Sequence, residues 1–201
     1  MKKNLLIGLF SLFVVLSASA QTQGERVLEQ ISSNLKEMVD YESDITVDVK
    51  GSTIEGSYRV SGESYHINMQ SVELWGQGDR RYEVSHKTQE VVIERVVGGD
   101  NMLLSNPARA FDLVGEGFDV KLEPSGEVIV LKPKADGKKR TMDVDKITIY
   151  IDPKSSLPTK ILYDADNDRA SIEFKGIKKS KSPLGNIDLS KYKKYDVVDL
   201  Y

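Results

Sequence analysis

The chain of 201 residues contains no cysteine. This absence excludes a disulfide framework, a thiol nucleophile, a cysteine-based zinc site and the lipid-bearing cysteine that follows the signal of a bacterial lipoprotein. Positive charge is not in excess either, because 28 Lys and Arg stand against 31 Asp and Glu. Nucleic-acid-binding proteins are usually strongly basic. We therefore expect no lipid anchor and no nucleic acid as a partner.

Signatures of enzymes and metal sites are also scarce. The two histidines, His66 and His86, lack the spacing of a metal-binding helix motif, and the sequence has no glycine-rich phosphate loop or nucleophile elbow. Asp164, Asp166 and Asp168 alternate as calcium ligands do, but the glycine and the final glutamate of an EF-hand loop are missing. A hairpin turn with solvated acids is the favoured interpretation, and a calcium site is the alternative. The sequence predicts a protein that is not an enzyme and holds no metal and no cofactor.

Long hydrophobic runs are absent after residue 20, so no membrane-spanning segment is expected there. The first 20 residues combine two lysines, an apolar run over 5–16 and the small residues Ala18-Ser19-Ala20. This order is typical of a secretory signal peptide, and its apolar run is too short to span a bilayer. We expect cleavage near Gln21 and an exported, soluble protein that forms a single domain over 21–201.

The rest of the chain shows a change of hydrophobic period. Apolar residues over 24–39 recur at steps of one, three or four, which indicates an amphipathic helix. From residue 45 onward, apolar and polar residues alternate between turn-forming glycines, asparagines and aspartates, a pattern typical of half-buried strands. The predicted strands are 45–49, 54–60, 64–70, 71–75, 80–84, 90–97, 118–122, 127–132, 141–151, 158–163 and 169–174.

These strands follow one another too closely to be parallel, because a parallel crossover needs about a dozen residues. They predict an antiparallel meander, interrupted by a short helix over 108–114 that begins after Asn106-Pro107. An open twisted sheet of this size tends to curl, and curling around a helix buries both. The expected fold class is α+β, mostly β: an incomplete, half-open antiparallel β-barrel of about eleven strands, wrapped around an N-terminal helix and a short lid helix.

One face of such a sheet, together with the two helices, would supply a large apolar surface. Packed cores and ligand cavities use the same residue types, so the pattern alone leaves both open. Glycines on both sides of 108–114 predict that this segment is a movable lid. The residues expected to line an apolar cavity and its lid are Val47, Val49, Tyr58, Val60, Tyr65, Ile67, Met69, Phe111 and Leu113.

The order of the parts is similar to that of a known family. A signal peptide, one amphipathic helix and a meander of strands are followed by a short helix and further strands. The segments that carry the likeness are Gly56-Ser57-Tyr58-Arg59-Val60, Gly78-Asp79-Arg80-Arg81-Tyr82, Asn106-Pro107, Val128-Ile129-Val130-Leu131-Lys132-Pro133-Lys134, Ile147-Thr148-Ile149-Tyr150-Ile151-Asp152, Leu157-Pro158 and Ile172-Glu173-Phe174. Together they resemble the LolA-type periplasmic carriers of outer-membrane lipoproteins.

The resemblance implies a fold and a function. In that family an incomplete antiparallel barrel encloses an apolar cavity, helices form a lid, and acyl chains are carried from an inner-membrane exporter to an outer-membrane acceptor. No reaction is implied. By this likeness the protein is expected in the periplasm as a monomer, and its expected partners are lipoprotein acyl chains or lipid, an exporter and an acceptor.

One motif of the family is absent. Its members often carry an Arg-Pro pair in the strand after the first hairpin, where this chain has Ser61-Gly62-Glu63, and Arg59 lies three residues early. Two alternatives to the carrier follow. One is an RseB-like envelope sensor of lipid or lipoprotein signals, and the other is an envelope structural or adaptor protein that binds no ligand. An interior completely filled by side chains would favour the adaptor.

Overall fold

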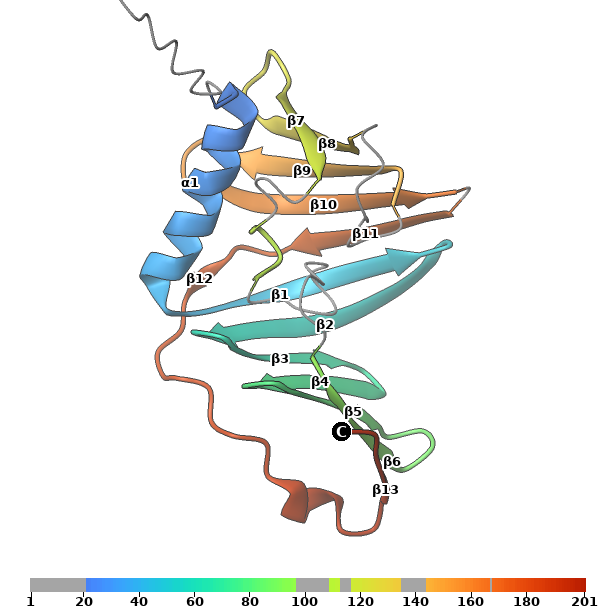
Figure 1. Cartoon of the computed structure of the whole chain (residues 1–201). Coiled ribbons are helices and arrows are strands. Elements are labelled where there is room, and N and C mark those ends of the chain that lie inside the picture. Colours follow the sequence, from blue (N-terminus) through green and yellow to red (C-terminus); the bar gives the residue numbers. More distant parts are fainter. Residues whose placement is uncertain (1–20, 97–108, 113–116, 135–143, 167) are drawn as a thin grey trace, which may run out of the picture.

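One large sheet makes up most of the computed structural model, which describes residues 21–96, 109–112, 117–134, 144–166 and 168–201 (Figure 1). The predicted signal peptide and most of the predicted short helix over 108–114 lie outside these ranges. The helical elements are α1 (Gln23–Met38) and the 3-10 helix η2 (Leu189–Tyr192). The strands are β1 (Asp40–Val49), β2 (Ser52–Ser61), β3 (Ser64–Met69), β4 (Val72–Gln77), β5 (Arg80–Ser85), β6 (Glu90–Arg95), β7 (Phe118–Leu122), β8 (Val128–Pro133), β9 (Lys146–Asp152), β10 (Leu157–Ala165), β11 (Asp168–Phe174), β12 (Lys178–Lys179) and β13 (Asp196–Asp199).

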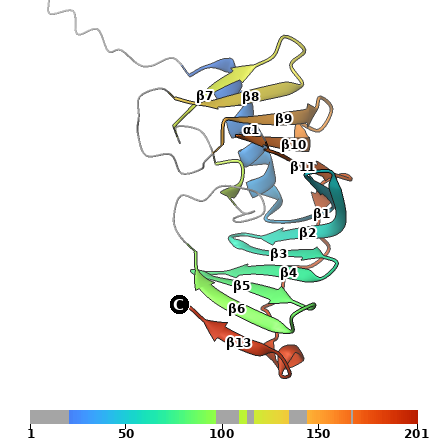
Figure 2. The same cartoon turned by 90° about the vertical axis from the view of Figure 1, so that its right-hand side faces the viewer.

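Two antiparallel meanders meet in the middle of this sheet. Strands β1 to β6 each pair with the next, strands β7 to β11 do the same, and β1 joins the two meanders by pairing with β11. The strand order is β13-β6-β5-β4-β3-β2-β1-β11-β10-β9-β8-β7, and the sheet is bent rather than flat (Figure 2). The predicted fold class is confirmed: the protein is mostly β, antiparallel and open. The two strands that the sequence did not predict are β12 and β13.

Helix α1 begins and ends one residue earlier than the apolar stripe predicts. It starts with a capping box: the Glu25 amide donates to Thr22 Oγ1 at 3.1 Å, and the Thr22 amide donates to the Glu25 carboxylate at 2.7 Å. Leu28 and Ile31 lie on the buried side of the helix and are fully shielded from solvent. The helix packs on β7 and β10 and therefore covers the half of the sheet that contains the second meander.

The main core lies between α1 and the inner face of the sheet. The register of the strands brings apolar residues opposite one another on this face, as in the pairs Val60–Tyr65 and Tyr58–Ile67 of β2 and β3. All four side chains are almost completely buried. Cross-strand pairs of this kind stabilise a sheet by roughly 0.2–1 kcal/mol each, so their register fixes which face of each strand is inward.

A second, smaller core lies on the opposite face of β4 to β6. Leu74 belongs to the main core, whereas the adjacent Trp75 points to the other face, where it pairs with Tyr82. The C-terminal strap, which we define as residues 177–201, covers this outer face and places Tyr192 in the second core (Figure 1). The last element predicted from the sequence ends at residue 174, so the strap is an addition to the predicted fold.

The carboxylate of Glu73 contacts both histidines of the chain and one tyrosine of the strap. Glu73 contacts the Nε2 atoms of His66 and His86 at 2.9 Å each, and the Tyr192 hydroxyl donates to it at 3.0 Å. The hydroxyl of Tyr195 lies 2.9 Å from Nδ1 of His86. Burial alone would raise the pKa of Glu73, but the hydrogen bonds from His66 and Tyr192 outweigh it and lower that pKa. An ionised carboxylate therefore joins β3 and β4 to the strap.

Candidate ligand-binding site

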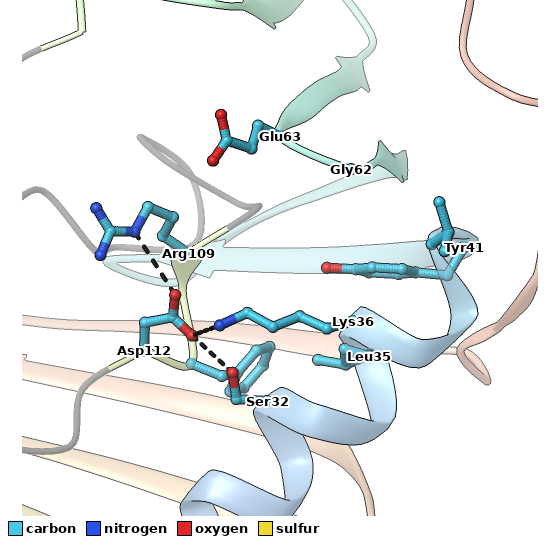
Figure 3. Close-up of a pocket in the computed structure, with 10 residues that line it drawn as sticks. Ser32, Leu35, Lys36, Tyr41, Gly62, Glu63, Arg109 and Asp112 are labelled. Carbon is cyan, nitrogen blue, oxygen red and sulfur yellow. Dashed lines mark hydrogen bonds and ion pairs between the residues drawn. The ribbon is translucent and has the colours of Figure 1, made fainter.

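A pocket of about 430 Å³ lies beside the C-terminal end of α1 (Figure 3). Its apolar floor consists of Leu35 from the helix, Tyr41 from β1 and Phe111, each at most 4% exposed. The Tyr41 hydroxyl lies 3.3 Å from that of Tyr58, and burial raises the pKa of Tyr41 to about 12, so the floor carries no charge. The volume is within the range of roughly 300–1,000 Å³ that is usual for small-molecule sites.

Charged side chains form the rim of this pocket around Asp112 (Figure 3). Its carboxylate accepts a hydrogen bond from Ser32 Oγ at 2.6 Å and an ion-paired one from Lys36 Nζ at 2.7 Å, and Arg109 Nε lies 3.6 Å away. We call these three contacts the Asp112 latch. Burial tends to raise the pKa of Asp112, but the bonds from Lys36 and Ser32 hold it below its usual value. The latch therefore joins α1 to the 109–112 segment by a charged contact.

A second hollow of about 580 Å³ opens on the other side of the latch. It shares Ser32, Lys36, Phe111 and Asp112 with the first pocket. The two hollows therefore adjoin at the latch and at Phe111.

The junction between α1 and β1 contains a strained residue. Val39 has φ 60° and ψ −57°, a region that β-branched residues avoid, and it is 57% exposed. Its amide donates to the Lys36 carbonyl at 3.1 Å, and its carbonyl accepts from the Gly62 amide at 2.9 Å. These two bonds attach the end of the helix to the turn between β2 and β3, which is the opposite wall of the pocket. Tertiary contacts thus hold Val39 in a conformation that its side chain disfavours.

We expect Val39→Gly to raise the free energy of unfolding by about 1 kcal/mol, because glycine adopts positive φ without steric cost. Val39→Ala keeps a Cβ and serves as the matched control, for which no gain is expected. Urea unfolding of the three proteins measures the difference. A destabilised Val39→Gly variant would show that the turn is not strained.

The structure brings together most of the residues that the sequence predicted for an apolar cavity. Val49 is 41% exposed at the end of β1, beyond the reach of the core, and Met69 is partly buried against it. Phe111 lines the pocket, and Leu113 lies outside the described residues. The remaining five are buried in the main core: Val47, Tyr58, Val60, Tyr65 and Ile67.

The polar residues of the latch were not predicted from the sequence. Ser32 and Lys36 are four residues apart and so lie on one side of α1, a spacing that by itself indicates no ligand. Their partner Asp112 is distant in sequence, and it lies in a tight turn in which its amide donates to the Arg109 carbonyl at 3.0 Å. This turn is the part of the predicted lid helix that the structure describes.

The aspartates of the last hairpin are partly neutralised. Asp164 contacts Arg169 at 2.6 Å and Lys146 at 2.9 Å, and these contacts lower its pKa. Within the described ranges, no three His, Asp or Glu side chains are grouped as metal ligands would be.

The protein is an open sheet with a ligand-sized hollow beside its helix, and its fold is similar to that of a solved structure. An uncharacterized conserved protein from Thermus thermophilus has a TM-score of 0.54 and 11% identity, over 89% of this chain and 99% of that chain. A likeness at this identity shows a common fold. No protein-family model and no curated protein matches the sequence.

Two further solved structures have lower scores. A LolA superfamily protein from Nitrosomonas europaea has a TM-score of 0.40 and 9% identity, over 86% of this chain and 98% of that chain. The MucA/MucB complex of Pseudomonas aeruginosa has a TM-score of 0.43 and 14% identity, over 81% of this chain and 59% of that chain. None of the helices in the described ranges has the length and apolar character needed to cross a membrane.

Proposed function

We propose that this protein binds acyl chains of lipids or lipidated proteins in the pocket beside α1 and carries them through the periplasm toward the outer membrane. The observation that carries the proposal is the apolar floor of Leu35, Tyr41 and Phe111, which lies beneath a charged rim. Burying each acyl CH₂ is worth about 0.8 kcal/mol. A pocket of this size can therefore hold a chain that water rejects and still release it to a larger apolar acceptor.

The distribution of charge around the pocket suits an amphipathic ligand. An acyl chain would contact the floor, while a polar head group would remain at the rim beside Lys36 and Arg109. Both cations also contact Asp112, so the latch lies on the same rim as the proposed head-group position. The proposed activity is binding and release, with no reaction.

The proposed location is the periplasm, and the proposed partners are an inner-membrane exporter and an outer-membrane acceptor. The signal-like segment over 1–20 and the LolA-like order of the strands support this proposal. An RseB-like envelope sensor is the second candidate. It is favoured by Gly62 and Glu63, which line the pocket where the carriers often have Arg-Pro.

Titration of detergent-free protein with a fluorescent sixteen-carbon fatty acid tests binding. We expect saturable fluorescence that unlabelled palmitate reverses. Mixing the loaded protein with lipid vesicles then separates the two candidates, because a carrier gives up the probe and a sensor retains it. Absence of saturable binding would contradict both.

Asp112→Asn is expected to release the bound probe about ten-fold faster. The substitution weakens the latch that joins the 109–112 segment to α1, and a hydrogen bond to a charged group contributes about 1.5–3 kcal/mol. Asp119→Asn removes an exposed carboxylate on β7 and is the matched control. Stopped-flow transfer to vesicles measures the rates. Equal release from Asp112→Asn and wild type would show that the latch does not limit exit.

The effect of the Asp112 latch on release of the probe should depend on pH in a defined direction. Because the pKa of Asp112 is lowered in the folded protein, the latch is complete above the ordinary pKa of about 3.9 and is lost as pH falls through the lowered value. Its contribution to release of the probe should therefore be constant from about pH 8 to 5.

A further inference from the structure

The two edges of the sheet differ in how they are covered. At the β7 edge, Thr22 Oγ1 donates to the Val120 carbonyl at 3.3 Å, and Gly24 packs so closely that a Cβ there would lie 3.0 Å from the Leu122 amide nitrogen. At the other edge, β13 is the outermost strand, and all four of its residues are exposed. Within the described residues, β13 is the uncovered edge.

Half of the main-chain groups of β13 point away from the sheet. The Asp196 amide donates to the Gln89 carbonyl at 2.9 Å, and the Leu200 amide donates to the Ile93 carbonyl at 2.8 Å. Because successive residues of a strand alternate in direction, the amides of Val197 and Asp199 face outward. They are placed to pair with a further strand.

Contacts on both sides hold this strand in place. Before it, Tyr192 and Tyr195 are bound to the Glu73–His86 pair. After it, the guanidinium carbons of Arg80 and Arg95 lie 4.4 and 4.8 Å from the centre of the Tyr201 ring. The edge is therefore formed before any partner arrives, which lowers the entropy cost of binding.

Exposed apolar side chains are concentrated in the same region. Among the described residues, eight large hydrophobic side chains are exposed, and five of them lie between 189 and 201. Val197 is 57% exposed and Leu200 is 66% exposed. An edge strand with apolar side chains and free main-chain groups is the usual template for strand addition.

We infer that the outer edge of β13 binds an extended strand of a partner protein in which two basic residues are separated by two apolar ones. The two charged residues of β13, Asp196 and Asp199, are both acidic and exposed, and two valines separate them. Lysines or arginines three positions apart on the added strand would lie opposite both acids and would be favourable. A second copy of this chain fits less well. Full-length antiparallel pairing of two β13 strands would place Asp196 opposite Asp199.

The test uses two fluorescein-labelled seven-residue peptides, one that repeats lysine-valine-valine and one that repeats glutamate-valine-valine. Fluorescence anisotropy should show that the lysine peptide binds about ten-fold more tightly. Exchanging both acids, as Asp196→Lys with Asp199→Lys, should reverse this preference. Equal binding of the two peptides to the wild type would overturn the inference.

Val197→Pro removes an outward amide while leaving the inward hydrogen bonds and the charge unchanged, so it separates strand addition from simple charge attraction. We expect it to abolish peptide binding, whereas Val197→Thr retains it. A lysine–valine peptide methylated on alternate amides tests the same point on the wild type, without a change to the protein. Unchanged binding in either experiment, or self-association through β13 without peptide binding, would overturn the inference.

Discussion

We expect Gly76→Ala to lower the free energy of unfolding by about 3 kcal/mol, which is the upper part of the usual range for overpacking a core. Gly76 on β4 lies opposite Tyr65 on β3, and the tyrosine ring rests on the glycine. A Cβ at this position would overlap the ring atoms Cε1 and Cζ. Tyr65 is 2% exposed and surrounded by the main core, so its ring has no free space into which to move.

A double-mutant cycle tests whether the Tyr65 ring causes this loss of stability. In a Tyr65→Leu background the same Gly76→Ala change should cost less than about 1 kcal/mol, because the shorter side chain leaves room for a methyl group. Chemical denaturation of the four proteins gives the coupling energy. An equal cost in both backgrounds would place the effect in the strand backbone instead.

We expect Phe111→Asp to weaken binding of the acyl probe at least about a hundred-fold. Phe111 lies on the floor of the pocket and borders both hollows, so an ionised carboxylate there would be desolvated by an acyl chain. It would also stand next to Asp112, and the two like charges would compete for Lys36. Probe titration and thermal unfolding, measured on the same samples, test this expectation.

Phe111→Leu is the matched control, because it keeps an apolar floor and should retain binding within about three-fold. The aspartate variant is expected to unfold cooperatively at a lower temperature, since Phe111 is also part of the main core. Unchanged binding by Phe111→Asp would exclude this pocket as the acyl site. If Phe111→Asp lost its cooperative transition and Phe111→Leu lost binding as well, Phe111 would be an ordinary core residue.

Local periodicity was sufficient to predict most of the fold. The helix was predicted to within one residue at each end, because its apolar stripe lies in one stretch of chain. Alternation predicted the strands of both meanders, and short connections required them to be antiparallel. The strand 118–122 matched the sequence prediction at both ends.

The strap could not be predicted in the same way. Residues 196–199 read Asp-Val-Val-Asp, which does not alternate, and their pairing with β6 is parallel and distant in sequence. The contacts of Glu73 could not be predicted either. His66 and His86 lie on different segments, and they reach Glu73 only when β3, β4 and β5 pair.

The pocket is likewise a product of tertiary structure. The sequence predicted an apolar inner face, and the structure packs most of it into a core, so the hollow is confined to the end of α1. Asp112 lies 76 residues from Lys36 and 80 from Ser32, and no spacing rule joins residues so far apart. Phe111 was predicted as a lid residue from the glycines on both sides of 108–114, and the structure places it in the lining of the pocket. Movement of this segment stays a prediction.

The most direct test of the proposed function is mass spectrometry of lipids extracted from the protein after purification, without detergent, from the cells that make it. Acyl lipids or lipidated peptides should be recovered in stoichiometric amounts from the wild type and lost from Phe111→Asp, with Phe111→Leu retaining them. A wild-type protein free of lipid, or equal recovery from the wild type and the folded Phe111→Asp variant, would contradict the account.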